Sequence, residues 1–562
     1  MSRQRKQLTT RLNVESLENR EVPSITMNQT THVWTATGTE QSDIIIVDRQ
    51  PNNLDNLRIR ILDRTTGALR ESNVRTATNV HRVVLLGEGG DDLLINWTMK
   101  PSSLSGGADR DSLIGGFGDD VLEGGSGDDS YIFTDSLPEL RSLDGSVIIS
   151  VIEPINVPAV HSLGTDRISN EGTNDSYDGI DLRGMKAGVN LDLAQIDVAQ
   201  TVQADRSFSL FLESANGQAG IEYVYGTDYD DSLRGDAGDN RLFGLVGTDT
   251  LEGRGGNDSL HGSEGSDTYL FRGSNLGTDR IYERDGTDTL DFSQLDSAVN
   301  LDLNSTTTQT VSANNLILTP GSYARNDLQF IESVVGSRFG DTIRGNALAN
   351  RLVGMNGNDI LEGRGGDDEL LGGEGSDTYV FAGLNLGHDS VHEVHEVPSD
   401  VPVQPVRDTQ LLVGDTLNFN GFGAAIKLNL GFSTRQTVAV GNLELTLDNR
   451  AGRVASIENV IGSQFNDMIA GNALNNWIDG VVGNDTIYGL SGNDTLIGGR
   501  GSDTLYGGED DDYLYGLVPG ATSSPVGERD VLDGEGGTDY METWFFYYVN
   551  GVLTPYRYIR SN

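Results

Sequence analysis

The stretch from Gly106 to Ile132 reads GGADRDSLI, GGFGDDVLE, GGSGDDSYI, which is one nine-residue phrase written three times. Its pattern is G-G-x-G-x-D-x-U-x, where U is a large apolar residue. The same frame returns in three further blocks, which begin at Gly226, Gly336 and Gly462. So many copies in one register do not arise by chance, and the repeat therefore decides the fold.

Each phrase combines a turn with a short strand. Glycine accepts positive φ, so the G-G-x-G part can turn tightly, and the x-U-x triplet has the alternation of a strand. The central apolar residue, such as Leu113, Leu122 or Tyr131, is expected to point inward. Two nonamers would make one coil, and stacked coils would place their strands about 4.8 Å apart. The pattern predicts an all-β parallel β-roll or β-helix solenoid.

The sixth position of the phrase carries a carboxylate in most copies. A turn that presents backbone carbonyls and a carboxylate to one point suits calcium, a hard cation that takes about six to eight oxygen ligands. We therefore predict calcium as the cofactor. The predicted ligands are Asp111, Asp120, Asp129, Asp231, Asp249, Asp258, Asp267, Asp341, Asp359, Asp368, Asp377, Asp467, Asp485, Asp494, Asp503, Asp512, Asp530 and Asp539.

Turns two repeats apart should stack, so partner aspartates should lie eighteen residues apart. The expected pairs include Asp111 with Asp129, Asp231 with Asp249, Asp341 with Asp359, and Asp485 with Asp503. In the second copy of the last three blocks the sixth residue is Asn240, Asn350 or Asn476. These copies should bind calcium weakly, or they could form a hydrogen-bond ladder between coils without metal.

The fourth block contains one irregular copy, GLVPGATSS at 516–524, which lacks the carboxylate and carries Pro519 in place of the fourth glycine. Proline fixes φ near about −65° and does not give the usual turn. With the frame counted through this copy, Ala521 falls between Asp503 and Asp539 on one edge of the roll. We expect calcium to be absent or weak beside Ala521.

These blocks resemble the β-roll of the RTX, or hemolysin-type calcium-binding, family. The segments GTDTLDFSQL at 286–295 and IENVIGS at 457–463 are similar to stretches that flank the β-roll of serralysin-like secreted proteases. The resemblance covers most of residues 85–543. It implies a right-handed parallel β-roll or β-helix solenoid in four calcium-binding repeat blocks with β-rich spacers, which folds on calcium and is exported.

The expected organisation follows the blocks. It is a leader or targeting segment at 1–24, a β-rich N-terminal lead-in at 25–84, RTX block 1 at 85–135, a spacer at 136–225, RTX block 2 at 226–273, a spacer at 274–335, RTX block 3 at 336–383, a spacer at 384–461, RTX block 4 at 462–542 and an aromatic C-terminal cap at 543–562. The aromatic tail could be a terminal strand that caps the roll or part of a C-terminal secretion signal.

Composition narrows the function further. The chain has 562 residues, a formal net charge of −45 and no cysteine. Nucleic acid is excluded as a partner because its binders need a basic stripe, and without disulfides the metal is the obvious stabiliser. No apolar run approaches the ~18 residues of a transmembrane segment. The first residues lack the apolar core of a secretory signal peptide, but LENREVPS at 17–24 resembles the head of many exported and surface bacterial proteins.

Catalytic motifs are missing from the sequence. HEVHE at 392–396 is similar to the zinc-protease motif H-E-x-x-H, but its histidines are three residues apart and not the four that the motif's two zinc ligands require. No G-x-S-x-G elbow is present. We therefore predict no enzyme and no catalytic residue, but a calcium-binding extracellular or cell-surface protein with a structural or adhesive role and glycans as a partner class. The alternatives are a secreted RTX-type enzyme (uronan epimerase, lipase or protease) and a component of a cytotoxin.

Overall fold

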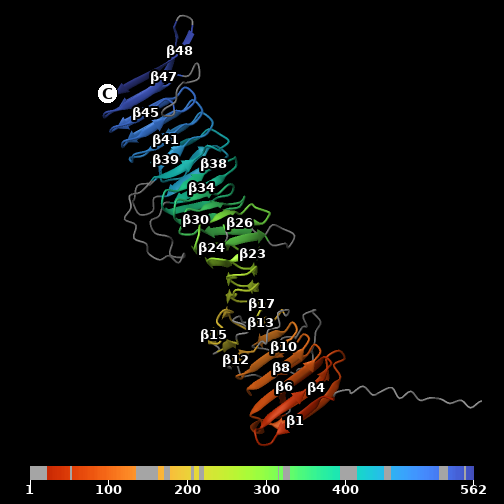
Figure 1. Cartoon of the computed structure of the whole chain (residues 1–562). Helices are drawn as coiled ribbons and strands as arrows, with labels where there is room; N and C mark the ends of the chain where they lie inside the picture. Colours follow the sequence, from red (N-terminus) through yellow and green to blue (C-terminus); the bar gives the residue numbers. More distant parts are fainter. Residues whose placement is uncertain are drawn as a thin grey trace, which may run out of the picture. The chain divides into compact units, whose positions relative to one another are not determined.

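The computed structural model describes residues 22–50, 53–134, 163–169, 177–203, 208–213, 220–313, 315–320, 330–392, 414–448, 457–517, 529–549 and 552–561. Their regular structure is strands, with short 3-10 turns such as η1 (Ala77–Asn79) and without an α-helix, so the predicted all-β class is confirmed. No helix among them is long and apolar enough to cross a membrane. The chain divides into two compact units, unit 1 (Met1–Thr227) and unit 2 (Asp228–Asn562), whose strands are labelled in Figure 1.

Unit 1 contains two runs of neighbouring strands that are mostly parallel. The first run is, in order, β1 (Ser24–Asn28), β2 (Val33–Thr37), β6 (Arg82–Gly89), β8 (Ser102–Ala108), β10 (Val121–Ser126), β12 (Gly164–Ile168), β16 (Phe208–Leu212) and β15 (Ala199–Gln203). The second is β5 (Leu69–Thr76), β4 (Asn53–Asp63), β3 (Asp43–Gln50), β7 (Leu93–Asn96), β9 (Ser112–Ile114), β11 (Ser130–Thr134), β13 (Gly179–Gly184) and β17 (Tyr223–Tyr225). A further short strand is β14 (Asn190–Asp192). The lead-in contributes antiparallel neighbours, because β3 pairs with β4 and β4 with β5.

Unit 2 has four such runs. The first is β19 (Arg241–Val246), β21 (Ser259–Glu264), β23 (Gly277–Tyr282), β27 (Leu316–Pro320) and β26 (Gln309–Ser312). The second is β18 (Ser232–Arg234), β20 (Thr250–Glu252), β22 (Thr268–Gly273), β24 (Asp288–Leu295), β28 (Ile331–Val335), β30 (Arg351–Asn356), β32 (Glu369–Glu374), β34 (Gly387–His392), β38 (Leu443–Asp448) and β37 (Gln436–Ala439).

The last two runs of unit 2 reach the C-terminal block. One is β25 (Asn300–Asp302), β29 (Thr342–Arg344), β31 (Ile360–Glu362), β33 (Thr378–Val380), β35 (Asp415–Asn418), β39 (Ile457–Ile461), β41 (Trp477–Asp479), β43 (Thr495–Ile497), β45 (Tyr513–Tyr515), β47 (Tyr540–Val549) and β48 (Val552–Ser561). The other is β36 (Lys427–Asn429), β40 (Met468–Ala470), β42 (Thr486–Ser491), β44 (Thr504–Glu509) and β46 (Val531–Glu535). β48 pairs antiparallel with β47, so a hairpin of the aromatic tail forms the end of its sheet.

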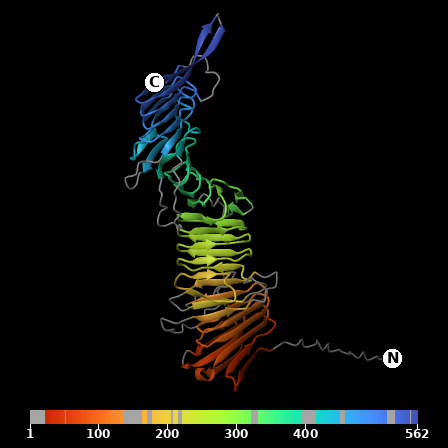
Figure 2. The ribbon, with the colours of Figure 1, turned by 60° about the vertical axis from the view of Figure 1, so that its left-hand side comes forward.

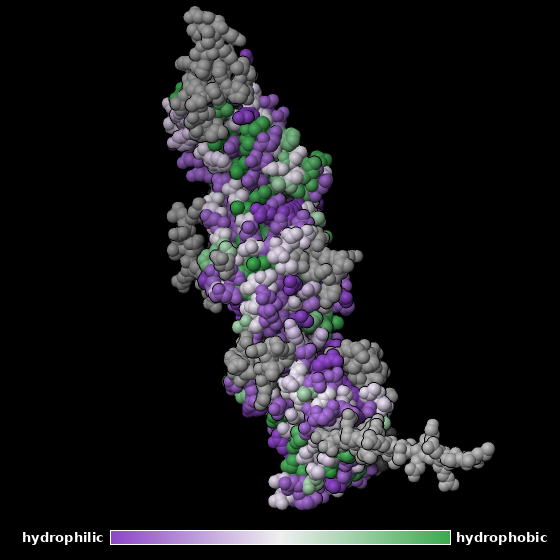
Figure 3. Space-filling view, turned by 45° about the vertical axis from the view of Figure 1, so that its right-hand side comes forward, coloured by the Kyte–Doolittle hydropathy of each residue, from purple (hydrophilic) through white to green (hydrophobic). Residues whose placement is uncertain are grey.

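The core is the column of eighth-position residues. Leu113, Leu122 and Tyr131 are each 0% exposed, as predicted, and Leu361 and Ile487 continue the same pattern in unit 2. Figure 2 shows the short strands of each unit stacked as successive rungs. On the face of unit 2 seen in Figure 3, hydrophilic residues predominate and hydrophobic ones are scattered among them. Alternation along each strand therefore separates an apolar interior from a polar surface.

Within each spacer of unit 2, one run of strands ends and another begins. In unit 2, the spacer at 274–335 ends one run with the antiparallel pair β26–β27 and starts a new run at β25. The second run passes through this spacer, because β24 pairs in parallel with β22 and β28. The spacer at 384–461 repeats the arrangement, with β37–β38 as the terminal pair and β36 as the new start. A spacer thus closes one sheet while a neighbouring sheet continues.

Candidate metal centre

Two kinds of glycine shape the repeat turns. At Gly354, in the first position of its copy, an added Cβ would overlap Oδ2 of Asp359 in the same turn. Gly265 is in the fourth position and has φ 136°, and its Cβ would overlap the carbonyl oxygen of Gly247 one coil away. Positive φ therefore explains the fourth glycine. The first glycine is required because the carboxylate of its own turn occupies the space.

Sixth-position aspartates form hydrogen-bonded ladders. The backbone N–H of Asp341 donates to Oδ1 of Asp359 at 2.7 Å, and the N–H of Asp359 donates to Oδ1 of Asp377 at 2.8 Å. The other predicted pairs make the same contact: Asp111 with Asp129 at 2.8 Å, Asp231 with Asp249 at 2.8 Å, and Asp485 with Asp503 at 2.9 Å. Turns eighteen residues apart are thus stacked with one carboxylate oxygen already bound.

The second carboxylate oxygen is buried and has no hydrogen-bond partner in most of these turns. Fourteen predicted ligands have such an Oδ2: Asp111, Asp120, Asp129, Asp249, Asp258, Asp267, Asp359, Asp368, Asp377, Asp485, Asp494, Asp503, Asp512 and Asp539. Asp92, Asp166 and Asp288, which the sequence analysis did not assign, share the feature. A buried carboxylate oxygen without a partner is costly, so each of these atoms requires a cation or a proton.

Burial has a large effect on the acidity of these groups. It raises the pKa of Asp359 to about 9 and that of Asp111 and Asp485 to about 8. Loss of hydration is the largest cause, and repulsion from the aspartates one coil away adds to it. A cation beside Oδ2 would offset both effects. Carboxylates and carbonyls are hard oxygen ligands, so the residues present fit calcium.

The first copies of blocks 3 and 4 are closed by a serine. The N–H and the hydroxyl of Ser337 donate to Oδ2 and Oδ1 of Asp341 at 2.5 and 2.8 Å. Ser463 makes the same contacts with Asp467 at 2.6 and 2.7 Å. Four predicted ligands do not have a buried Oδ2 without a hydrogen-bond partner: Asp231, Asp341, Asp467 and Asp530. The closed turns offer fewer free lone pairs to a metal than the other turns.

The asparagine copies are closed in a related way. The N–H of Asn346 donates to Oδ1 of Asn350, and the N–H of Asn350 donates to Oδ1 of Asp368, both at 2.8 Å. Asn240 and Asn476 have the same pair of contacts. The inter-coil hydrogen bonds foreseen for these copies are present, as they are in the aspartate turns. Their affinity for calcium stays a prediction.

The register expected for the end of the fourth block is wrong. The N–H of Asp503 donates to Oδ1 of Asp530, and the N–H of Asp512 donates to Oδ1 of Asp539, across 27 residues in both cases. Asp539 therefore does not follow Asp503 on one edge. β44 pairs directly with β46 and β45 with β47, so both runs advance by one strand across these 27 residues. The irregular copy at 516–524 lacks the fourth-position glycine and the sixth-position carboxylate of a regular turn, and Ala521 lies outside the described residues.

Spacer residues that sequence reasoning missed extend the ladders. Asp129, Asp267 and Asp377 donate their N–H groups to Oδ1 of Asp178, Asp288 and Asp415 at 2.7, 2.8 and 2.8 Å. These three in turn donate to Oε2 of Glu222, Glu332 and Glu458 at 2.8, 3.0 and 3.0 Å. On the other edge, Asp120, Asp258 and Asp368 donate to Oδ1 of Asp166, Asp279 and Asp389 at 3.0, 3.0 and 3.2 Å.

A weak sequence signal marks the missed residues. Asp166, Asp279 and Asp389 each follow Leu-Gly by one residue, in the segments LGTDRI at 163–168, LGTDRI at 276–281 and LGHDSV at 386–391. These segments keep the fourth, sixth and eighth positions of the nonamer and lose the first glycine. GTEQSDIII at 38–46 is a further copy, in which Thr39 donates its N–H to Oδ2 of Asp43 at 2.8 Å.

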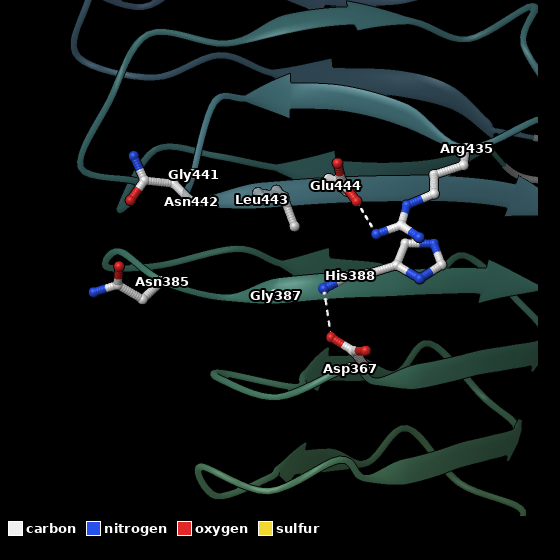
Figure 4. A pocket seen from close by; sticks show the side chains of 9 residues that line it. All are labelled: Asp367, Asn385, Gly387, His388, Arg435, Gly441, Asn442, Leu443 and Glu444. Atoms are coloured by element: carbon white, nitrogen blue, oxygen red, sulfur yellow. Dashed lines mark hydrogen bonds and ion pairs between the residues drawn. The ribbon is translucent and has the colours of Figure 1, made fainter.

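A separate polar pocket lies on unit 2, between the ends of β34 and the hairpin β37–β38. It has a volume of ≈ 350 Å³ and is lined by Asp367, Asn385, Gly387, His388, Arg435, Gly441, Asn442, Leu443 and Glu444. Figure 4 shows the His388 ring beside the guanidinium of Arg435, which forms an ion pair with Glu444. Nε2 of His388 is 2.9 Å from Oγ1 of Thr446. The pocket offers both donors and acceptors.

The HEVHE phrase falls at the end of a strand. His392 is the last residue of β34 and its Nε2 lies 3.6 Å from Oε1 of Glu369. His395 lies outside the described residues. Of the phrase, only His392 lies among the described residues, and its backbone is extended.

Comparison with known proteins agrees with this geometry. The family model of the RTX calcium-binding nonapeptide repeat matches residues 103–131, 216–251, 243–273, 344–379, 461–496 and 488–517. No curated protein matches the chain. The matched segments contain most of the orphaned carboxylate oxygens.

Proposed function

We propose that this chain, which carries RTX calcium-binding nonapeptide repeats, is an exported protein that folds on calcium and has a structural, surface or adhesive role outside the cell. The observation that carries the proposal is the series of buried Oδ2 atoms without partners along the ladders. In a metal-free fold each of these carboxylates would be either ionised without hydration of its Oδ2 or protonated at neutral pH. Calcium supplies the missing positive charge.

The energetic cost of folding without metal is large. Burial raises the pKa of Asp92 to about 8 and of Asp249 to about 7. Each pKa unit corresponds to about 1.4 kcal/mol, and ordering the glycine-rich turns adds conformational entropy. A ligand that binds only the folded state stabilises it by RT ln(1 + [L]/Kd) per site. Filled calcium sites can therefore offset the cost.

The cellular compartment follows from the affinity expected of such sites. Extracellular calcium modules bind at roughly 10⁻⁴ to 10⁻³ M. At these affinities the repeats would remain unfolded before export and would fold outside. The chain has no cysteine, so its stability outside the cell would depend on metal and packing and not on disulfides.

Circular dichroism tests this proposal on the full chain. We expect little β-structure in excess EGTA and a cooperative gain of β-signal in about 10 mM calcium, roughly ten times the weak end of that affinity range. Magnesium at the same concentration is the control, because it demands a smaller octahedral site and should give little gain. Identical spectra in EGTA and in calcium would show that the protein does not fold on calcium.

The pocket beside His388 supports the surface role. Its volume of ≈ 350 Å³ is at the low end of ligand pockets, and its lining could hydrogen-bond a hydroxylated ligand such as a glycan unit. A glycan screen in calcium, with the Arg435→Ala variant as comparison, tests this role. Glycan binding that depends on Arg435 supports an adhesive function, whereas equal binding by the variant removes the pocket from it.

We propose no catalytic function. The extended backbone at His392 supports this reading over a zinc-protease helix, and the enzyme and cytotoxin alternatives have no comparable support. The purified protein should contain no stoichiometric zinc. Zinc at one equivalent, together with proteolysis that is lost in His392→Ala, would overturn the reading.

A further inference from the structure

Three carboxylates meet at the junction of block 2 and the following spacer. Asp267, Glu283 and Asp288 are 1%, 3% and 0% exposed, and one oxygen from each lies within 4.8 Å of the others. Asp267 is a predicted ligand, whereas Glu283 and Asp288 belong to the spacer. The earlier steps of this ladder, from Asp231 to Asp249 and from Asp249 to Asp267, each join one aspartate from each of two turns.

The sequence explains how the third carboxylate enters. Residues 283–291, ERDGTDTLD, keep the fourth and sixth positions of the nonamer as Gly286 and Asp288. Gly286 has φ 149°, and a Cβ there would overlap the carbonyl oxygen of Gly265, as in a regular turn. The first position, however, is Glu283 in place of glycine. A coil of the roll therefore carries an acidic side chain where the repeat normally has none.

The oxygens of the cluster point into one small space. Oδ2 of Asp267 and Oδ2 of Asp288 are buried and have no hydrogen-bond partner. A Cβ added to Gly262 would overlap Oδ2 of Asp267 and Oε1 of Glu283, so only a glycine leaves this space open. The hydroxyl of Tyr269 donates to Oε1 of Glu283, and the N–H of Arg284 donates to Oε2 at 3.0 Å.

Charge in the cluster is not balanced by the protein. Among the described residues, no lysine or arginine forms an ion pair with Asp267, Glu283 or Asp288. Three carboxylates this close repel one another strongly in a buried site. They also offer one oxygen each towards the roughly six to eight oxygen ligands that calcium takes. The remaining ligands would be water and backbone carbonyls.

We propose that Asp267, Glu283 and Asp288 form a three-carboxylate calcium site that fills before the two-aspartate slots of the repeats. The proposal rests on the calcium-dependent folding proposed above and adds Glu283 as a ligand outside the repeat pattern. The affinity of a calcium site rises with the number of charged ligands. A site with one extra buried carboxylate is therefore the tightest of this ladder.

Terbium, which shares the preference for hard oxygen ligands, is a suitable probe. The calcium-stripped full chain is titrated with up to one equivalent of terbium, and tyrosine-sensitised emission is recorded, since the Tyr269 hydroxyl contacts Glu283. Glu283→Gln should weaken binding of the first equivalent at least about tenfold, as loss of a metal-supporting group does elsewhere. Asp285→Asn, an exposed carboxylate two residues away, is the matched control and should change nothing.

Two further measurements separate the possible outcomes. Tyr269→Phe keeps all three carboxylates, so emission from the first equivalent should fall while binding by equilibrium dialysis is largely retained. Circular dichroism in saturating calcium checks that each variant folds. If Glu283→Gln binds the first equivalent as tightly as the natural protein, the three-carboxylate site is wrong while calcium folding stands. If the natural protein binds no metal, the proposed function itself fails.

Discussion

Replacing Asp359 by asparagine should have opposite effects with and without calcium. Asp359 is 1% exposed, and its Oδ1 accepts the N–H of Asp341 at 2.7 Å. Its Oδ2 has no partner. Asparagine has nearly the same shape and occupies the sixth position at Asn350, so the turn tolerates it. The substitution therefore removes the charge and a metal ligand and leaves the fold of the turn in place.

The magnitude follows from the pKa of the carboxyl. Burial raises the pKa of Asp359 from 3.8 to about 9, with repulsion from Asp377 and Asp341 as the smaller cause. The metal-free folded state thus binds this proton more tightly than the unfolded chain, and its stability falls as pH rises from 3.8 towards 9. At about pH 7.5 the loss of unfolding free energy caused by this carboxyl in the metal-free protein is up to roughly 5 kcal/mol, at about 1.4 kcal/mol per pH unit. Asparagine carries no such penalty.

Urea unfolding measured in EGTA and in calcium is the assay. In EGTA, Asp359→Asn should raise the free energy of unfolding, and the gain should grow with pH between about pH 5 and pH 8. In calcium the variant should be less stable than the natural protein and should bind calcium more weakly. If the natural chain is too unfolded in EGTA at about pH 7.5 to give a transition, the comparison is made near pH 5, where the carboxyl is protonated.

Asp341→Asn is the matched control for this experiment. Ser337 already donates to both oxygens of Asp341, and burial raises the pKa of Asp341 only to about 6. Its substitution should give a smaller gain in EGTA and a smaller loss of calcium affinity. Equal effects of the two substitutions, or a destabilised Asp359→Asn variant in EGTA at every pH, would refute the role assigned to the orphaned oxygen.

Two further predictions concern the turn and the register. Gly354→Ala should lower calcium affinity and stability, because the added Cβ would overlap Oδ2 of Asp359. Gly365→Ala should be nearly neutral, because the nearest atom to its added Cβ is 3.4 Å away. Calcium titration and thermal melts of both variants check this. Tyr506 and Asp533 are register partners in β44 and β46, so the double variant Tyr506→Cys, Asp533→Cys should form a disulfide under mild oxidation in calcium. The chain has no other cysteine, and failure to form this crosslink in folded protein would contradict the 27-residue step.

The repeat made the interior and the stacking predictable. Period and polarity alone placed Leu113 and Tyr131 in the core, since alternation in a short strand leaves one face for apolar residues. The eighteen-residue spacing followed from two nonamers per coil, and the contact of Asp341 with Asp359 agrees with it. These properties depend only on local geometry that every copy shares.

Differences between copies were harder to predict, because they depend on contacts that the consensus does not contain. Ser337 and Ser463 occupy the second position, where a hydroxyl can reach the carboxylate of its own turn. These contacts occupy both oxygens of Asp341 and Asp467. A G-S start alone does not predict them, because the copy that begins Gly262-Ser263 keeps an unpartnered Oδ2 on Asp267. The step from Asp503 to Asp530 could not be counted from the frame, because nine residues without the turn-forming side chains need not make a rung.

The ladders have defined ends, and the sheets of unit 2 do not end at the same spacer. Ser337 and Ser463 close the first turns of blocks 3 and 4, and Glu332 and Glu458 accept the last N–H groups of the ladders of blocks 2 and 3. Where β26–β27 and β37–β38 end their runs, the parallel pairs β24–β28 and β35–β39 carry the neighbouring runs across the spacer. In a stacked array, stability is shared between adjacent repeats through their interfaces. Calcium bound in one block of unit 2 should therefore stabilise the next block through a continuous sheet, even though the aspartate ladder itself is interrupted.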